Sequence, residues 1–519
     1  MYVKNGGSST AEGTRESASL DYIDTALDKI INMDPPQPAD WIIQVSGSYS
    51  GHPYTLFRDT ITTENASSIT IQGKTGNDTD ILDRGCTTKT TNGYVFNVVT
   101  AVPVTIKNIK ITGAYVNGSG GGITVGATAN VTLGEGALIQ GNKAGTNGGG
   151  VYVAGNAESV GKLTILSGAE ISNNSTDLSA TPTTSGNGGG IYSKGIVVMK
   201  GGTISGNSAS RGGGVYLTKD ANNITSVFYM SGDACIGDSS SHTPYYASAT
   251  NRSNYADGTN ENGGGIYIYA GSAKFGVTCN LDTMEEEDEL LSGGIYYNYA
   301  SGYGGGIYSS STIYGEANIV IKSGNISYNT SGMGGGGIYF TSSTSGNVSI
   351  IEMSGGTISQ NYVPVGKKGG AVALSAGTAA NTFLVMSGAA NIPKSEDHNN
   401  YIAFTSSSNT YGGIMISGAL SSSSGPFMLD AASCTTANFN PTSLINKYGS
   451  VSDSDFSTAV SKFNLSYVAC IGSTNYYTQK DAYDAIIGAS ENVRIELGEA
   501  CTGFMLGLEG ACICRTWQP

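Results

Sequence analysis

Short apolar runs recur along the chain, and the intervals between them are rich in Gly, Ser, Asn and Thr. Within residues 188–207, three such runs follow one another, at 188–192, 196–199 and 203–204. The pattern then begins again with a second glycine triplet, 24 residues after the first. A repeat of roughly 20–50 residues is typical of solenoid proteins, in which each unit packs only against its neighbours.

Two motifs mark the repeat. The first is a glycine triplet followed by Ile or Val and, in most copies, by Tyr. The triplets begin at Gly120, Gly148, Gly188, Gly212, Gly263, Gly304 and Gly334, with weaker copies at Gly293, Gly369 and Gly412. The second motif is Ile-x-x-Asn, which ends at Asn142, Asn174, Asn207, Asn329 and Asn361. The first motif alternates like a strand with one buried face, because side chains point to opposite sides along a strand.

This arrangement predicts an all-β fold, a right-handed parallel β-helix. Each rung of the coil contributes three short strands, and each strand pairs with its equivalent one rung away. The Ile or Val of the first motif points inward, where its burial contributes roughly 1.5–3 kcal/mol. The asparagines are expected to stack at a corner, where they hydrogen-bond the turn backbone and the asparagine of the next rung.

The tyrosines of the first motif are expected to point outward and to form a ladder along one face. They are Tyr152, Tyr192, Tyr216, Tyr267, Tyr296, Tyr308 and Tyr339. Two interpretations stay open at this point. Stacked aromatic side chains can stabilise neighbouring rungs, or they can form a stripe that contacts sugars or proteins.

The chain divides into four predicted segments. Residues 1–40 hold an N-terminal segment, and its apolar spacing over 16–33 predicts a helix that covers the open end of the coil. Residues 41–430 form the coil of roughly a dozen rungs. We expect a linker over 431–465 and, over 466–519, a short α/β segment with an irregular tail. That segment is predicted to hold a strand pair at 467–477, a helix at 479–487 and a strand at 493–497.

Composition narrows the function. The 519 residues carry a net charge of −14 and no run of Lys or Arg, so nucleic-acid binding is not expected. No apolar run approaches the ~20 residues that span a bilayer, which argues against a transmembrane segment. The eight cysteines show no metal-ligand spacing, so we expect neither a metal nor another cofactor. The N-terminal residues lack the apolar stretch of a secretory signal.

The repeats over residues 120–415 resemble those of the chlamydial polymorphic outer membrane proteins and related bacterial β-helix surface proteins. Those repeats carry a Gly-Gly-Ala-Ile type motif, matched here at 369–372, and a Phe-x-x-Asn motif, which is Ile-x-x-Asn in this sequence. The resemblance implies export and an adhesin-like role at the bacterial cell surface, in association with the outer membrane. The family also carries a signal peptide and a C-terminal membrane barrel. Because neither is recognised here, we expect part of a longer protein or a variant anchored by other means.

Motifs for catalysis are not found in the sequence. Carbohydrate-active β-helix enzymes use clustered carboxylates and bases, and the densest acidic cluster here is Asp78, Asp80 and Asp83 beside Arg84. That cluster lies in a Gly/Asn-rich turn, where we expect the carboxylates to bind turn backbone. The charge run at 285–289 is expected to be a solvated loop, with a weak cation site as the alternative. We therefore assign no catalytic residue and do not expect an enzyme.

Rung lengths vary, and long insertions are expected at fixed edges of the coil. The longest, between Gly237 and Gly263, is rich in Tyr, Ser and Asn, which together make adaptable binding loops. We expect a ligand site there, formed by Tyr245, Tyr246, Arg252, Tyr255, Tyr297, Tyr299 and Tyr303. The main hypothesis is an extracellular, adhesin-like protein that binds a protein or glycan on another cell or surface. The alternatives are a carbohydrate-active enzyme and a purely structural segment of a larger protein.

Overall fold

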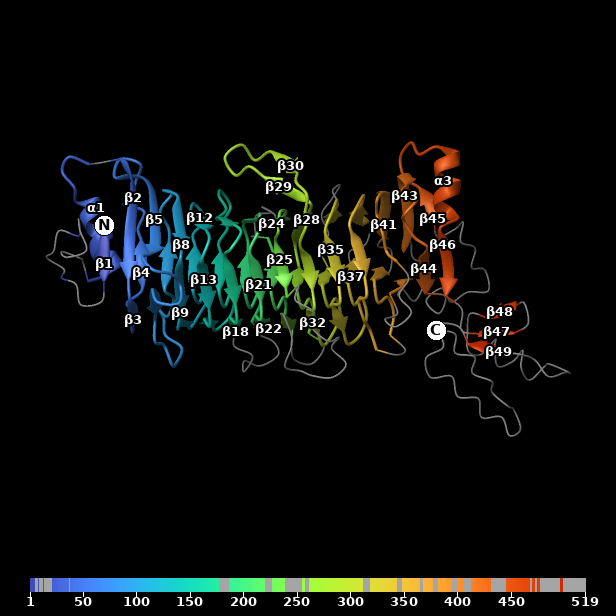
Figure 1. The fold of residues 1–519 in the computed structure, drawn as a ribbon, viewed down its shortest axis with the longest axis horizontal. Coiled ribbons are helices and arrows are strands. Elements are labelled where there is room, and N and C mark those ends of the chain that lie inside the picture. The colour runs from blue at the N-terminus through green and yellow to red at the C-terminus, as the bar shows by residue number, and fades with distance from the viewer. Residues whose placement is uncertain are drawn as a thin grey trace, which may run out of the picture.

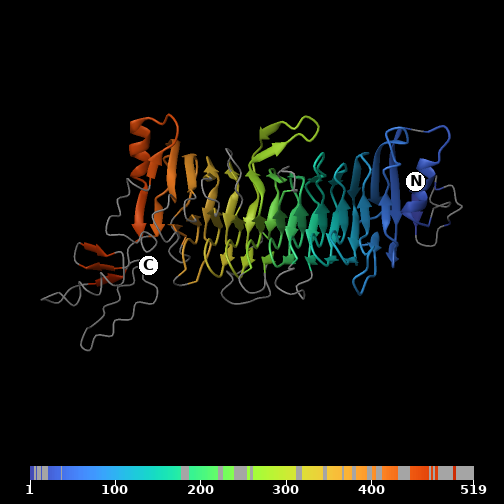
Figure 2. The same cartoon turned by 180° about the vertical axis from the view of Figure 1, so that it is seen from behind.

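The chain coils into a rod of stacked parallel strands in the computed structural model (Figures 1 and 2). The predicted right-handed parallel β-helix is confirmed. The structure describes residues 1–4, 8, 13, 21–36, 38–176, 186–219, 226–238, 254–256, 261–310, 318–342, 348–364, 367–376, 381–393, 400–404, 412–430, 445–466, 469–471, 474–476 and 495–497.

Four parallel sheets run along the rod, which we name A, B, C and D. A full rung passes through sheets C, A, B and D in that order, as in β19 (Ile191–Ser193), β20 (Ile196–Met199), β21 (Thr203–Ser205) and β22 (Ser208–Ala209). The sequence predicted the first three strands of a rung. It missed the two-residue strand of sheet D, which follows the asparagine corner and precedes the next glycine triplet.

Sheets A and C are the longest and extend over nearly the whole rod. Sheet A has 14 strands: β1 (Tyr2–Lys4), β2 (Ala39–Ser46), β5 (Ala66–Gly73), β8 (Val104–Lys107), β12 (Asn130–Leu133), β16 (Lys162–Ile165), β20, β24 (Ser226–Met230), β28 (Gly271–Phe275), β34 (Ile319–Ile321), β38 (Val348–Met353), β41 (Asn381–Gly388), β43 (Gly412–Leu420) and β45 (Ile445–Lys447). Sheet C has 13: β4 (Thr55–Phe57), β7 (Phe96–Val98), β11 (Ile123–Val125), β15 (Val151–Val153), β19, β23 (Val215–Leu217), β27 (Ile266–Ile268), β33 (Ile307–Ser309), β37 (Ile338–Ser342), β40 (Val372–Ala376), β42 (Ile402–Phe404), β44 (Phe427–Asp430) and β46 (Phe463–Ser466).

Sheets B and D are shorter. Sheet B has 10 strands: β3 (Ser48–Ser50), β6 (Ile81–Asp83), β9 (Ile109–Thr112), β13 (Ala137–Gln140), β17 (Glu170–Ser172), β21, β25 (Cys235–Gly237), β31 (Gly294–Tyr296), β35 (Asn325–Ser327) and β39 (Thr357–Ser359). Sheet D has 7: β10 (Tyr115–Val116), β14 (Lys143–Ala144), β18 (Ser175–Thr176), β22, β26 (Tyr255–Ala256), β32 (Tyr299–Ala300) and β36 (Thr330–Ser331).

One continuous hydrophobic core fills the coil, because every rung turns the apolar members of its strands inward. Val151, Ile191 and Val215 are register partners on consecutive rungs of sheet C, and all three are fully buried. The core reaches from Val3 to Phe463 without a break between domains. The inward Ile and Val of the glycine motif therefore stabilise the fold as the sequence predicted.

A ladder of asparagines lines the corner between sheets B and D. Within the described chain it comprises Asn142, Asn174, Asn207, Asn254, Asn298, Asn329, Asn361 and Asn400, all fully buried. The carboxamide oxygen of Asn207 accepts from the backbone N–H of Asn174 at 2.9 Å and from its Nδ2 at 3.0 Å. In turn Asn207 Nδ2 donates to Asn254 Oδ1 at 3.0 Å and to the Ile171 carbonyl at 2.9 Å. The predicted corner stack is confirmed, and it satisfies the polar groups of turns that are closed to water.

Each position of the triplet requires glycine for its own steric reason, as the copy at residues 188–190 shows. Gly188 has φ +66°, a left-handed conformation that side chains rarely adopt. A Cβ on Gly189 would collide with backbone carbonyl oxygens of the following rung, including that of Gly213. A Cβ on Gly190 would lie 2.7 Å from the Gly214 carbonyl oxygen and 3.0 Å from Asn207 Nδ2. The triplet therefore lets the chain pass close over the asparagine ladder.

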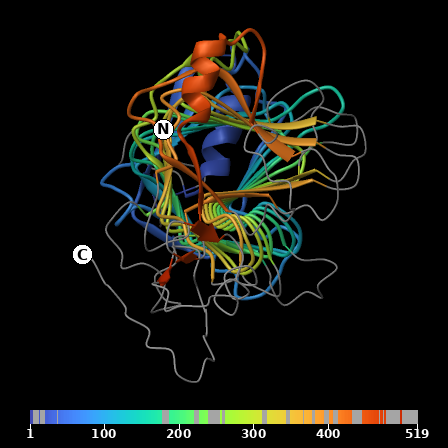
Figure 3. The ribbon, with the colours of Figure 1, turned by 90° about the vertical axis from the view of Figure 1, so that its right-hand side faces the viewer.

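The predicted capping helix is present as α1 (Ile23–Ile31), which begins later than residue 16. Its apolar face, formed by Ile23, Ala26, Leu27 and Ile30, is buried in the core of the coil. Asp24 ties the helix to sheet C, since it accepts from Thr55 Oγ1 at 3.0 Å. In the view along the rod, α1 lies across the interior of the coil (Figure 3). The helix therefore shields the first rung from water, as a solenoid cap must.

The coil continues beyond residue 430, into the stretch for which the sequence predicted a linker. Strand β45 pairs with β43 in sheet A, and β46 pairs with β44 in sheet C. Helix α3 (Asp453–Val460) lies between these two strands in the chain. Beyond them, β47 (Ala469–Ile471) pairs antiparallel with β48 (Thr474–Tyr476) and β49 (Ile495–Leu497). The strand pair and the later strand match the prediction, whereas the helix expected at 479–487 falls outside the described residues.

Two of the weaker glycine copies occupy other sheets than the motif predicts. The Gly-Gly-Ile at 293–295 enters β31 in sheet B, and the one at 412–414 enters β43 in sheet A. Both have the local composition of the motif, but in the described chain β31 follows the strand β30 (Glu286–Asp288) and β43 follows β42 of sheet C. Their place in the rung is therefore set by the strands before them and not by the glycines.

Candidate functional site

Six of the seven predicted tyrosines form a row on the outer face of sheet C. Consecutive ring centroids along Tyr152, Tyr192, Tyr216, Tyr267, Tyr308 and Tyr339 are 5.4, 5.3, 5.0, 4.6 and 5.7 Å apart. Tyr296 was wrongly included. It belongs to β31 in sheet B, where its hydroxyl accepts from Asn325 Nδ2 at 3.2 Å.

The tyrosine row packs against itself more than it faces solvent. Tyr192, Tyr216 and Tyr267 form a buried cluster with their neighbours in the row, and burial raises the pKa of each of these phenols. Because neighbouring rings cover one another, the ring faces between Tyr152 and Tyr339 are not available to a ligand. Of the two interpretations, the geometry supports stacked aromatics that stabilise consecutive rungs.

Four of the predicted binding residues lie together on the described chain, along the corner that contains sheet D. Tyr255 and Tyr299 are register partners in β26 and β32. Tyr297 stacks on Tyr328 with centroids 4.9 Å apart and ring planes 3° from parallel. The ring centroids of Tyr303 and Tyr339 are 4.3 Å apart, so Tyr303 links this corner to the tyrosine row. The other three predicted residues, Tyr245, Tyr246 and Arg252, fall outside the described residues.

Two tyrosines at this corner have a strained backbone. Within the described residues, the one directly before a ladder asparagine is left-handed in six rungs, at Gly141, Asn173, Gly206, Tyr297, Tyr328 and Gln360. Gly and Asn tolerate this conformation, but it is unfavourable for a bulky side chain. Tyr297 and Tyr328 nevertheless adopt it, with φ of 57° and 60°. Sequence analysis missed Tyr328, although the Tyr-Asn pairs at 297–298 and 328–329 repeat at the same place in consecutive rungs.

We call the set Tyr255, Tyr297, Tyr299, Tyr303 and Tyr328 the tyrosine edge. All five are half-buried, so each presents part of its surface to solvent. Beside it, Arg211 Nε lies 4.0 Å from Glu261 Oε2, a loose pair. Burial raises the pKa of the Glu261 carboxyl, and the nearby Arg211 opposes that shift. The edge therefore combines aromatic surface with one weakly paired cation and anion.

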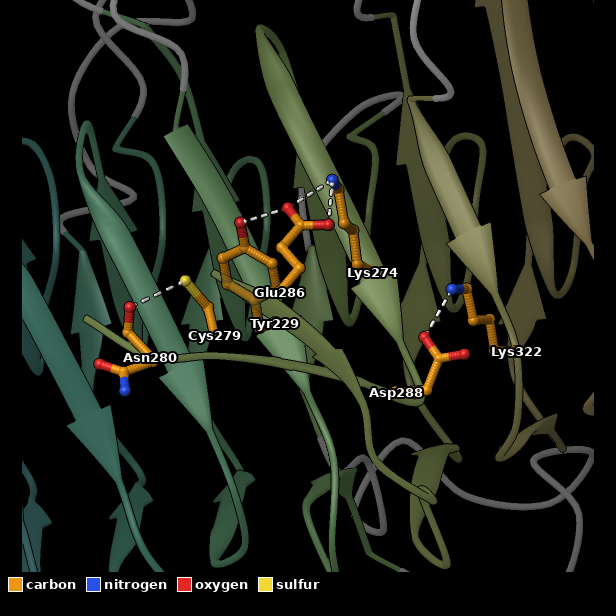
Figure 4. Close-up of polar contacts among 7 residues, drawn as sticks. All are labelled: Tyr229, Lys274, Cys279, Asn280, Glu286, Asp288 and Lys322. Carbon is orange, nitrogen blue, oxygen red and sulfur yellow. Dashed lines mark hydrogen bonds and ion pairs between the residues drawn. The ribbon is translucent and has the colours of Figure 1, made fainter. Parts of the chain in front are cut away.

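The acidic run at 285–289 is largely exposed, as expected, but residues 286–288 form a strand and not a loop. Strand β30 (Glu286–Asp288) pairs antiparallel with β29 (Val277–Cys279), and the hairpin projects from the rod between β28 and β31 (Figure 1). Two of its carboxylates, both partly exposed, are paired with lysines (Figure 4). Glu286 receives Lys274 Nζ at 2.7 Å and the Tyr229 hydroxyl at 2.7 Å, and Asp288 receives Lys322 Nζ at 2.6 Å.

The contacts with Lys274 and Tyr229 lower the pKa of the Glu286 carboxyl. Burial acts to raise the pKa of Glu286, but the hydrogen bonds from Lys274 and Tyr229 outweigh it and hold the pKa below its ordinary value. Within the described residues, no group of three His, Cys, Asp or Glu side chains could hold a metal ion. The convergent charges of the hairpin are therefore engaged with one another.

The acidic cluster near Asp80 binds turn backbone, as the sequence predicted. The fully buried Asp80 carboxylate accepts from the backbone N–H groups of Gly47 at 2.7 Å, Gly76 at 3.0 Å and Thr75. Asp83 accepts from the Gly85 N–H at 2.8 Å. Arg84 donates to two backbone carbonyls, those of His52 and Asn92. Each of these side chains closes a turn between rungs.

Comparison with models of known protein families, with curated proteins and with solved structures finds no match to this chain. Among the described residues, no helix has the length and apolar character needed to cross a membrane. The class of the protein, a right-handed parallel β-helix, therefore stands on the geometry of the chain itself.

Proposed function

We propose that this chain is an adhesin-like β-helix protein, exported to the cell surface or secreted, which binds a protein or glycan through the tyrosine edge. The observation that carries the proposal is the left-handed backbone of the stacked pair Tyr297 and Tyr328. The proposal extends to this chain the surface role of the polymorphic outer membrane proteins that its repeats resemble.

The two tyrosines are informative because the corner needs a left-handed residue at this position but does not need a tyrosine. Gly141 and Gly206 occupy the same backbone position in other rungs, at no steric cost. A bulky residue in this conformation costs about 1 kcal/mol or more. Strained backbone of this kind is concentrated at functional sites. Aromatic side chains also dominate the energetics of many binding interfaces.

The pairing of charges favours binding over catalysis. A hydrolase or lyase needs an acid and a base that reach the substrate. On the described chain the carboxylates that converge, Glu286 and Asp288 in the hairpin and Asp80 in its turn, are hydrogen-bonded to lysines, to a tyrosine or to backbone. A carbohydrate-active enzyme remains the alternative to test.

The test begins with the whole chain on glycan and cell-surface protein arrays, together with a panel of polysaccharides incubated to completion. We expect saturable binding to a defined glycan or protein, with no new reducing ends or unsaturated products. Cleavage of any polysaccharide would contradict the proposal and support the enzyme. Fractionation of the source cells tests export, and a protein confined to the cytosol would contradict the proposed location.

A further inference from the structure

The acidic hairpin covers a part of sheet A where the usual pattern of the strands is broken. All four residues of β20 are buried, although its alternate residues Ile196 and Val198 point away from the interior core. With Tyr229 they form a separate apolar cluster against Val277 and Cys279 of the hairpin. A strand that is apolar on both faces is a strand covered on both faces. Here the second cover is β29.

Polar contacts anchor the hairpin at four of the five consecutive sheet A strands from β16 to β34, and β20 contributes the apolar contacts. Lys162 in β16 donates to the Leu281 carbonyl at 2.5 Å, and Ser231 after β24 donates to Glu289 at 3.0 Å. Lys274 in β28 and Lys322 after β34 hold Glu286 and Asp288 (Figure 4). The hairpin therefore spans the strands from β16 to β34 along the rod.

The two ends of this attachment differ in chemistry. The cover over β20 is apolar, whereas the attachment at β28 and β34 depends on carboxylates. The groups that face Glu286 are Tyr229 of β24, Lys274 of β28 and, further away, Lys322 after β34; the Cys279 thiol lies nearby on β29. The described strands beneath the hairpin, β20, β24 and β28, pair with one another through backbone hydrogen bonds, and the asparagine ladder that joins their rungs is neutral.

We propose that the hairpin is an acid-released strap, which detaches from sheet A when Glu286 is protonated while the rungs beneath stay paired. At neutral pH the strap is closed, since the ionised carboxylates hold both lysines. As the pH falls, protonation neutralises Glu286 and removes its attraction to Lys274 and Lys322. The pKa of this carboxyl is lowered in the closed state, so protonation favours the open state. The apolar strip around Ile196 and Val198 then becomes accessible.

The chain carries its own reporter of strap opening. Cys279, in strand β29 of the hairpin and packed against sheet A, is 2% exposed, and Cys235 is 7% exposed in β25, away from the hairpin. We would label the whole protein with 4,4′-dithiodipyridine, which reacts in acid, and assign each modified thiol by peptide mass spectrometry. Between pH 7 and pH 3.5 we expect the Cys279 rate to rise about tenfold relative to the Cys235 rate. An unchanged ratio, or equal rises at both thiols, would overturn the strap.

Matched variants separate the strap from a merely rigid hairpin. Glu286→Gln at pH 7 should raise the Cys279 labelling rate about fivefold, because it removes a partly buried ion pair. Glu287→Gln changes the neighbouring exposed carboxylate and should leave the rate unchanged. Equal behaviour of the two variants would show that the Lys274 contact does not hold the strap. Circular dichroism of both variants should match that of the unmodified protein.

Discussion

Replacement of Asn207 by Ala tests the asparagine ladder as the element that closes the corner of the rungs. The Asn207 side chain makes four hydrogen bonds, two accepted from Asn174 and one donated to each of Ile171 and Asn254. Asn207 and its three partner residues are all fully buried. Each buried group left without a partner costs about 1–3 kcal/mol. Some groups keep a second partner, such as Asn254 Oδ1, which also accepts from the Asn207 N–H. We therefore expect Asn207→Ala to destabilise its rung by about 4 kcal/mol.

Native-state hydrogen exchange measures this loss rung by rung, which suits a solenoid because its unfolding need not be two-state. Protection should fall in peptides covering residues 170–219 and stay unchanged in the first rungs. Asn130→Ala is the matched control, since Asn130 lies half-buried on sheet A outside the ladder. It should change stability by less than about 0.5 kcal/mol. A loss below about 1 kcal/mol for Asn207→Ala would refute the ladder argument.

Two further substitutions probe the packing and the pH response of the coil. Gly190→Ala should destabilise its rung by about 2 kcal/mol, because the new Cβ would collide with the Gly214 carbonyl oxygen. Gly118→Ala is the control, since a Cβ there would have no atom within 4 Å, and it should not change the thermal unfolding of the protein. Burial lowers the pKa of His52 to about 4, so its unfolded form binds a proton first as the pH falls. Stability of the capped end should therefore drop by up to about 3 kcal/mol between pH 6.5 and pH 4. His52→Phe should abolish that drop, as followed by Trp41 fluorescence in urea; a persistent drop would contradict the assignment to His52.

The coil could be predicted from the sequence because every rung has to meet the same packing constraints. A glycine triplet must pass over the asparagine ladder, and the residue after it must fill the core, so these positions recur in the sequence. Three ladder members were missed. Asn254 and Asn400 are separated by insertions from the isoleucine that normally precedes the corner by three residues, and Asn298 follows Ile295, which was assigned to a copy of the glycine motif. Tyr296 was misplaced because Gly293-Gly294-Ile295 has the composition of the motif but belongs to sheet B.

The strap and the strained tyrosine pair were harder to predict, since both depend on contacts between rungs. The all-apolar β20 was a usable signal for a second cover, but nothing local identifies the acidic run some 90 residues later as its partner. The left-handed conformation of Tyr297 and Tyr328 is likewise imposed by the corner and not by the residues themselves. Four of the predicted site residues lie near one another because tyrosines are dense in one insertion and in the rung that follows it, but their role in binding stays a prediction.

The most direct test of the proposed function compares ligand binding by Tyr297→Gly/Tyr328→Gly with binding by the single variant Gln360→Gly. Both place glycine at left-handed positions before a ladder asparagine, so the backbone is relieved in each and stability should stay within about 1 kcal/mol of the unmodified chain. Binding of the array ligand, measured by calorimetry, should fall at least tenfold for the tyrosine variant and stay unchanged for Gln360→Gly. Full affinity in the folded tyrosine variant would contradict the claim that this edge binds the ligand.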